Sequence, residues 1–240
     1  MRKINKLCAY LLALGITLVI VVAYLHFKDG APLQISLATA CDGKGECRDP
    51  VALLEGPINL RSESKTTSDL LDFIKSHPEV DTVCLVSEGG DVDTSVALGR
   101  FIHRKGLKTC IANKYKKADG SERKGYCQSS CVWVSISGNE SILYDNSALL
   151  GFHAARVQDL FGNVKRIDSE GLLKFAGLIK EVARDTAEQN RLYGLLLWSF
   201  DQGTTTDTTD CSAQQVQEHY PYFSKVKDIN NGTYAVCELR

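Results

Sequence analysis

The chain has 240 residues, of which 44% are hydrophobic and 24% charged, and its net charge is −1. This length suits one large globular domain or two small ones, and the balanced charge gives no basic field that would favour nucleic acid. The sequence contains no P-loop, GxGxxG or zinc-ribbon pattern. Cys127 and Cys131 have no second cysteine or histidine pair at metal-ligand spacing, so neither a metal nor another cofactor is expected.

Residues 1–30 predict a targeting segment that lies outside the fold. Three basic residues precede an uncharged run, Leu7–Leu25, which is long enough to cross a bilayer once as a helix of about 20 residues. Positive charge on this side keeps the N-terminus in the cytoplasm. The segment therefore predicts a single-pass inner-membrane anchor with the remaining chain in the periplasm. A cleaved signal peptide is the alternative, but the one small-x-small site, Ala38-Thr39-Ala40, lies well past the run.

The cysteines indicate an oxidising compartment. Of nine, Cys8 falls in the targeting segment and leaves an even number for disulfide bonds. The pairs that we predict are Cys41–Cys47, which closes a short loop, Cys110–Cys127, which brackets a lysine-rich loop, and Cys211–Cys237, which brackets the C-terminal segment. Cys84 lies within an apolar run and is expected to be a buried thiol. Spacing does not fix connectivity, so these pairs are hypotheses.

The first half of the chain alternates strands and helices. Residues 31–50 are expected to form a linker with a disulfide knuckle, and residues 51–240 one α/β domain. A short buried strand is predicted over 51–58, ending at a Gly-Pro turn, and an amphipathic helix over 68–77, ending before a proline. The fully apolar run 82–86 predicts a buried parallel strand.

Ser87-Glu88-Gly89-Gly90 follows that strand directly. Two adjacent glycines permit a backbone turn that is closed to other residues, and such a turn can aim free N–H groups at a developing negative charge. A plain strand-to-helix turn is the simpler alternative. A helix is then expected over 92–105 and a strand over 107–112. Residues 113–125, with four lysines and one arginine, predict a solvated polar loop, which beside an active site could bind an acidic partner.

The segment Cys127–His153 concentrates the reactive side chains. Gln128-Ser129-Ser130 opens a helical apolar stretch, and a second apolar run ends at His153. A hydroxyl residue at the start of a buried helix, with a histidine at the end of the next strand, is the arrangement that Ser–His nucleophilic catalysis needs. A core helix with a polar cap and a surface histidine is the non-catalytic alternative.

The remaining chain predicts one long helix over 169–199, a turn-rich stretch over 203–210, a short helix capped by Ser212 and a last strand over 232–237. Strand and helix alternate along the whole chain, which indicates an α/β fold.

Taken in order, these motifs resemble the Clp-protease/crotonase superfamily, whose fold consists of repeated β-β-α layers. They are most similar to exported ClpP-like periplasmic proteins with a Cys-x-Ser-x-Cys motif, over about residues 51–220. The resemblance implies that Ser129, rather than Ser130, is the nucleophile and that His153 is its base. It also implies that the N–H groups of Gly89 and Gly90 form the oxyanion hole.

The third member of the triad is less defined. In this superfamily the acid precedes a short helix, where Thr208 aligns best between Asp207 and Asp210, and of these we favour Asp210. A Ser–Lys mechanism like that of signal peptide peptidase A, a related exported enzyme, could use Lys180 instead.

The resemblance implies a membrane-anchored, periplasm-facing serine hydrolase, most simply a peptidase that acts on peptides or proteins and could form a homo-oligomer. A catalytically inactive binding or scaffold module is the alternative. A crotonase-type acyl-thioester enzyme is disfavoured, because an exported domain meets no coenzyme A.

Overall fold

The computed structural model describes residues 33–59, 63–158, 164–202 and 208–228, together with Gly15, Thr17 and Cys237. Nearly all of the predicted anchor and of the predicted last strand lies outside these residues. Within them, no helix is both long enough and apolar enough to cross a membrane. The compact unit Pro32–Arg240 contains the elements described below.

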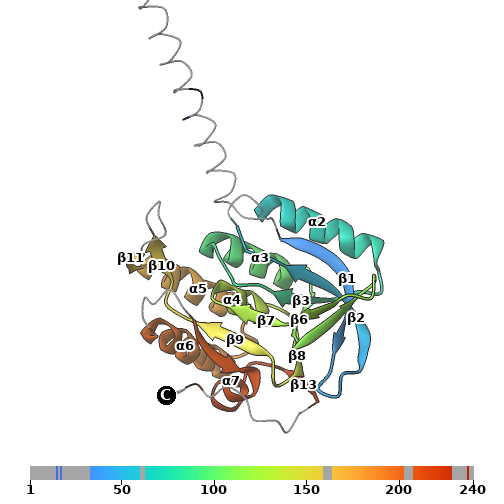
Figure 1. Cartoon of the computed structure of the whole chain (residues 1–240). Helices are drawn as coiled ribbons and strands as arrows, with labels where there is room; N and C mark the ends of the chain where they lie inside the picture. The colour runs from blue at the N-terminus through green and yellow to red at the C-terminus, as the bar shows by residue number, and fades with distance from the viewer. Residues whose placement is uncertain are drawn as a thin grey trace, which may run out of the picture. The chain divides into compact units, whose positions relative to one another are not determined.

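An eight-stranded sheet forms the centre of this unit, in the order β13-β8-β4-β3-β2-β1-β5-β6 (Figure 1). Its parallel strands are β2 (Cys47–Glu55), β3 (Thr82–Val86), β4 (Lys108–Ile111), β8 (Ser141–Asp145) and β13 (Lys225–Asp228). Antiparallel strands continue one edge, namely β1 (Gln34–Cys41), β5 (Lys114–Lys117) and β6 (Glu122–Lys124).

A second, three-stranded sheet has the order β12-β9-β7. Its members are β7 (Tyr126–Gln128), β9 (Leu149–Phe152) and β12 (Thr209–Ser212), with β7 parallel and β12 antiparallel to β9. A bridge between Ser87 and Cys127 joins the end of β3 to β7. This bridge brings the Gly-Gly turn after β3 alongside the serines that follow β7. A separate hairpin, β10 (Arg156–Gln158) with β11 (Val164–Ile167), follows His153.

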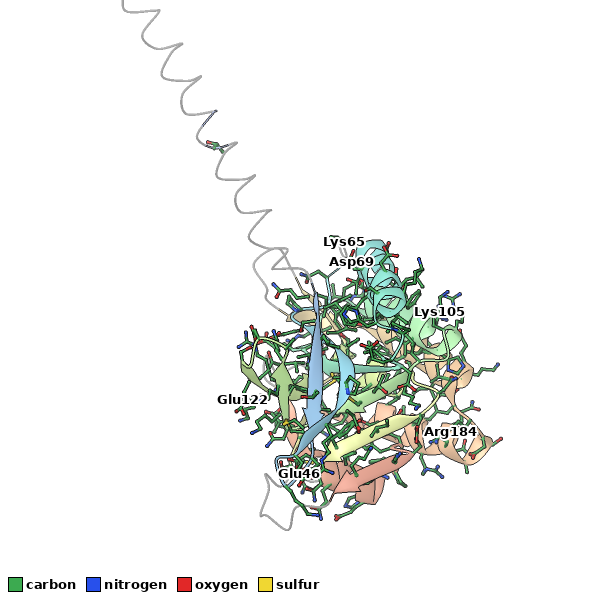
Figure 2. The ribbon with its side chains drawn as sticks, turned by 90° about the vertical axis from the view of Figure 1, so that its right-hand side faces the viewer. Glu46, Lys65, Asp69, Lys105, Glu122 and Arg184 are labelled. Atoms are coloured by element: carbon green, nitrogen blue, oxygen red, sulfur yellow. A yellow bond between two sulfur atoms is a disulfide. The ribbon has the colours of Figure 1, made fainter. Side chains whose placement is uncertain are left out.

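The helices pack together on one side of the large sheet. They are α2 (Glu63–Ser76), α3 (Val92–Arg104), α4 (Ser130–Ser135), α5 (Ser169–Val182), α6 (Thr186–Asp201) and α7 (Ala213–His219). Helix α3 contacts α2, α4 and α5, and α5 contacts α6. Strand β3 is buried along its whole length, as predicted for a parallel strand covered on both faces. Charged side chains such as those of Lys65, Asp69 and Lys105 lie on the outside (Figure 2).

Residues 31–50 are not a linker, because they contain β1 and the start of β2. These strands pair antiparallel, and the Cys41–Cys47 disulfide lies where they turn. Ala38 and Ala40 are buried against one face of the sheet. The knuckle is therefore part of the domain.

The lysine-rich segment 113–125 also differs from the predicted loop, since it contains the β5–β6 hairpin. The buried ring of Tyr115 fixes the hairpin, and its hydroxyl accepts a hydrogen bond from the Ala112 N–H at 2.8 Å. One aromatic residue among charged neighbours thus attaches this segment to the sheet edge.

The predicted long helix over 169–199 is two helices. Ala183 has an extended backbone that ends α5, and Asp185 caps α6 by accepting a hydrogen bond from the Glu188 N–H at 2.7 Å. An aspartate cap starts a new helix because it satisfies an otherwise unpaired N–H group.

The disulfides join the eight cysteines from Cys41 to Cys237, in the pairs Cys41–Cys47, Cys84–Cys110, Cys127–Cys131 and Cys211–Cys237. The first and last pairs confirm the prediction. The predicted Cys110–Cys127 pair is wrong, and Cys84 is not a free thiol. Cys84 and Cys110 are direct register partners on neighbouring parallel strands, with Cα atoms 4.5 Å apart, and sequence spacing does not reveal that register.

Candidate active site

The Gly89-Gly90 turn after β3 packs closely against the loop of residues 128–130. Gly89 and Gly90 have φ angles of 85° and 145°, a region open to glycine and costly for other residues. A Cβ on Gly89 would lie 2.6 Å from the Gln128 carbonyl oxygen and 2.7 Å from the Ser129 Cβ. The Ile58 N–H donates to the Gly89 carbonyl at 2.9 Å and fixes the turn from its other side. Both glycines are therefore required by close backbone approach.

The free N–H groups differ from the predicted pair. The Gly89 N–H donates to the Ser87 hydroxyl at 3.0 Å, so it is already bonded. Within the described chain, the N–H groups of Gly90 and Ser130 have no acceptor, and the Ser130 nitrogen would lie 2.8 Å from a Cβ on Gly89. Gly90 and Ser130 therefore offer unbonded N–H groups where the Gly-Gly turn approaches the serines, and we assign these two as the oxyanion donors. The signal that sequence reasoning missed is the position after the nucleophile, which often supplies such an N–H.

Ser129 has a strained backbone. Its φ of 55° and ψ of −129° make it the one non-glycine residue with a positive φ in the part of the chain that the structure describes. Such a conformation costs on the order of 1–3 kcal/mol and persists only where the surroundings enforce it. Here the Ser129 N–H donates to the Gly151 carbonyl at 2.7 Å, and its carbonyl accepts from the Val132 N–H at 3.1 Å.

The two serines differ in access. Ser129 is half-buried, whereas Ser130 is 3% exposed and its hydroxyl is enclosed without a partner among the residues described. A nucleophile must reach its substrate, so this difference favours Ser129.

His153 directly follows β9, and its ring is set for use as a base. Nδ1 lies 2.6 Å from the Ala154 carbonyl oxygen, and because a carbonyl only accepts, Nδ1 carries the proton and Nε2 is left as an acceptor. Burial lowers the pKa of His153 below its ordinary 6.5; the Ala154 carbonyl opposes this shift, and the Arg156 charge adds to it. The neutral imidazole therefore prevails near pH 7.

No hydrogen bond joins the Ser129 hydroxyl to His153 in the described chain, although both line one pocket. Catalytic hydrogen bonds are often long without substrate and shorten when it binds. The arrangement is therefore compatible with a Ser–His pair.

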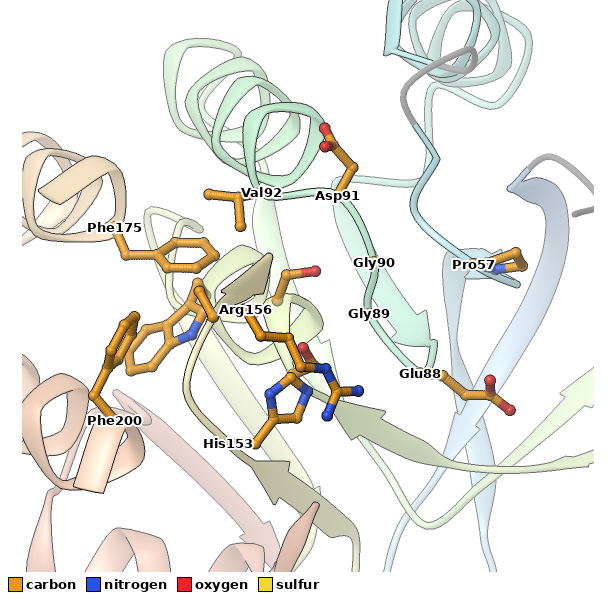
Figure 3. A pocket seen from close by; sticks show the side chains of 14 residues that line it. Pro57, Glu88, Gly89, Gly90, Asp91, Val92, His153, Arg156, Phe175 and Phe200 are labelled. Carbon is orange, nitrogen blue, oxygen red and sulfur yellow. The ribbon is translucent and has the colours of Figure 1, made fainter. Parts of the chain in front are cut away.

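The pocket has a volume of about 440 Å³, a size typical of small-molecule and side-chain sites. Its reactive lining is Gly89, Gly90, Ser129, Ser130 and His153. Figure 3 shows Val92, Phe175 and Phe200 on one side, Glu88 on the other, and Arg156 beside His153. The pocket thus offers an apolar wall next to a charged rim.

Among the described residues, no hydrogen bond or ion pair joins Asp210 to His153. Its Oδ1 accepts hydrogen bonds from Gln128 Nε2 at 3.0 Å and from the Thr208 hydroxyl at 2.6 Å. Gln128 and Asp210 are both register partners of Gly151, on opposite sides of it. Because Gly151 has no side chain, the Asp210 carboxylate reaches across it to Gln128. In this structure the Ala154 carbonyl occupies the position at Nδ1 that an orienting acid would take.

The other candidates for the third catalytic residue are Asp207 and Lys180, and no described contact supports either of them. Asp207 lies outside the described residues. Lys180 is an exposed residue of α5 and does not line the pocket. A Ser–Lys pair with Lys180 therefore has no support in this arrangement.

The comparisons with known proteins concern the fold. No protein-family model and no curated protein matches the sequence. A serine-to-alanine mutant of the 1510-N membrane-bound stomatin-specific protease is similar in structure, with 12% identity and a TM-score of 0.51 over 74% of this chain and 79% of that chain. A lysine-to-alanine mutant of that protease, in complex with a substrate peptide, has 11% identity and a TM-score of 0.51 over 74% of each chain.

The ClpP protease catalytic domain from Plasmodium falciparum is similar at 14% identity and a TM-score of 0.48, over 77% of this chain and 87% of that chain. At such identities a likeness shows the fold alone. The likeness to the 1510-N protease shows that the two chains share a mixed α/β fold.

Proposed function

We propose that this protein is a serine peptidase in which Ser129 is the nucleophile and His153 its base. The observation that carries the proposal is the strained backbone of Ser129, which lies beside the free N–H groups of Gly90 and Ser130 and shares a pocket with His153. Strain of this kind gathers at functional sites. The fold that the chain shares with proteases supports the same function.

The chemistry follows from these positions. The Ser129 hydroxyl oxygen attacks the substrate carbonyl while Nε2 of His153 takes its proton. The resulting oxyanion accepts hydrogen bonds from the Gly90 and Ser130 N–H groups. Nδ1 keeps its own proton, which stays hydrogen-bonded to the Ala154 carbonyl. Nε2 then gives the proton that it took from Ser129 to the leaving amine. A water molecule repeats the sequence to release the acyl group and restore Ser129.

We also propose that the protein is membrane-anchored through Leu7–Leu25, with its peptidase domain on the exported side, where it could form a homo-oligomer. The uncharged run and the basic residues before it support the anchor. The disulfides support an oxidising compartment.

Cleavage of a peptide library by the detergent-solubilised full chain tests the proposed activity. Mass spectrometry of the products should show cleavage by the wild type and none by Ser129→Ala. Lys180→Ala should cleave like the wild type, because Lys180 lies outside the pocket. Cleavage that persists in Ser129→Ala, or disappears in Lys180→Ala, would contradict the mechanism.

The second candidate is a peptide-binding module without catalysis. The engagement of Asp210 by Gln128 and Thr208 favours it, because a triad acid would be expected on His153. In that case peptides bind the wild type and Ser129→Ala equally, and neither protein cleaves them.

A further inference from the structure

We infer that the Cys127–Cys131 disulfide is a positioning device for the nucleophile, which keeps Ser129 in its strained conformation and the Ser130 N–H on the oxyanion side. This inference rests on the proposed function for its catalytic meaning. Its structural part, that the disulfide acts as a covalent clamp on the strained backbone of Ser129, can be measured without an activity assay.

The disulfide encloses the residues that matter to the proposed chemistry. Cys127 lies in β7, Cys131 lies in the first turn of α4, and only Gln128, Ser129 and Ser130 stand between them. Both cysteines are 0% exposed. The bond therefore ties the end of a strand to the start of a helix across the loop with the positive φ.

Both ends of this clamp are fixed in the protein. On the strand side, the Gln128 N–H donates to the Ser87 carbonyl at 2.9 Å. On the helix side, Val132 and Val134 are buried in the core that α4 shares with its neighbours. A bond between two fixed elements limits the backbone angles available to the residues between them, as a strained conformation requires.

A role in overall stability explains this disulfide less well. The unfolded-state entropy that a cross-link removes grows with the length of the loop it closes. Cys84–Cys110 and Cys211–Cys237 each join residues 26 apart, whereas Cys127–Cys131 joins residues 4 apart. The shortest loop contributes least to global stability, so its main constraint falls on Ser129 and Ser130.

The neighbouring contacts hold the loop mainly from the strand side, and on the helix side the Val132 N–H donates to the Ser129 carbonyl at 3.1 Å. The Gln128 amide is bound by Asp210 and Thr208, and the Ser129 N–H is bound by Gly151. Without the disulfide, the backbone between these two anchored elements can relax, and Ser129 can return to a negative φ. That relaxation moves both the Ser129 hydroxyl and the Ser130 N–H, while Val92, Phe175 and Phe200 of the pocket wall lie on other helices and stay in place.

The test compares two short disulfides in the full-length protein. Cys127→Ala/Cys131→Ala should lower kcat by about 100-fold, the cost of a displacement near 1 Å, and leave KM within about 2-fold. Amide exchange at Ser129 should become faster. The matched control, Cys41→Ala/Cys47→Ala, opens a loop of similar size in the β1–β2 hairpin and should keep the kcat of the wild type. An unchanged kcat in the Cys127/Cys131 variant overturns the inference.

Amide exchange separates this inference from the proposed function. If the wild type cleaves nothing, faster exchange at Ser129 in the Cys127/Cys131 variant still supports the clamp, and unchanged exchange refutes it. If that variant does not fold, the wild type is reduced stepwise with a phosphine, and the open disulfides are identified by alkylation. Faster exchange at Ser129 that follows the opening of Cys127–Cys131 supports the clamp. Faster exchange at Ser129 that follows the opening of a different disulfide overturns the inference.

Discussion

Replacing Asp210 with asparagine separates two roles for this carboxylate. A triad acid would accept a hydrogen bond from His153. In the structure, Asp210 accepts hydrogen bonds from Gln128 and Thr208 instead. Asparagine keeps a carbonyl oxygen that can accept the same hydrogen bonds but carries no charge. The two roles therefore predict different losses from one substitution.

The magnitudes are far apart. Loss of a triad acid by this substitution lowers kcat by about 10⁴, or roughly 5.4 kcal/mol at 1.36 kcal/mol per tenfold. In the observed arrangement, each of the two hydrogen bonds changes from charged to neutral and loses about 1 kcal/mol. Asp210→Asn should therefore lower the free energy of unfolding by about 2 kcal/mol and lower kcat by less than about 10-fold.

Steady-state kinetics and urea unfolding of Asp210→Asn give both values, with Asp210→Ala beside it. The alanine removes the acceptor entirely and should cost about 1–3 kcal/mol of stability, with a larger loss of kcat. If Asp210→Asn slows turnover by about three orders of magnitude or more and leaves the stability unchanged, this reasoning is refuted and Asp210 is restored as the acid on His153.

Two further predictions concern the pocket. Arg156→Gln removes a positive charge that lowers the pKa of His153, so this pKa should rise. The acid limb of the plot of kcat/KM against pH should then move to higher pH, and a limb that stays in place contradicts the assignment of His153 as the base. Gly90→Ala should cost about 3 kcal/mol or more of unfolding free energy by urea titration, because its φ is 145° and its Cβ would collide with the Ile58 carbonyl. Gly120→Ala, also at a positive φ but in open space, should cost about 1–2 kcal/mol, and equal losses at the two positions would contradict the clash.

Much of the site could be predicted because its residues follow strands. Gly89 and Gly90 come after a buried parallel strand, and His153 comes after a second apolar run. The two strands lie in different sheets, but β7 is bridged to the end of β3 and also pairs with β9, so it links the ends of both strands. The structure does bring these residues and Ser129 to one pocket, while their chemical roles stay predictions.

Other features of the fold and the site could not be predicted, and two of them depend on strand register, which cannot be read from sequence spacing. The Cys84–Cys110 pair follows from the alignment of two neighbouring strands. The diversion of Asp210 to Gln128 follows from a glycine that lies between them in the second sheet. The bond from the Gly89 N–H to Ser87 is a local contact within the turn, and no spacing rule predicts it.

Labelling with a fluorophosphonate tests the central claim most directly, because the probe reacts only with an activated serine. Intact-mass and peptide mass spectrometry of the full-length protein should find one adduct, on Ser129. Labelling should be absent in Ser129→Ala and should be slowed by at least about 100-fold in His153→Ala, since an unassisted hydroxyl is a poor nucleophile. An adduct on Ser130, equal labelling of Ser129→Ala, or a folded protein that takes no label would contradict the account.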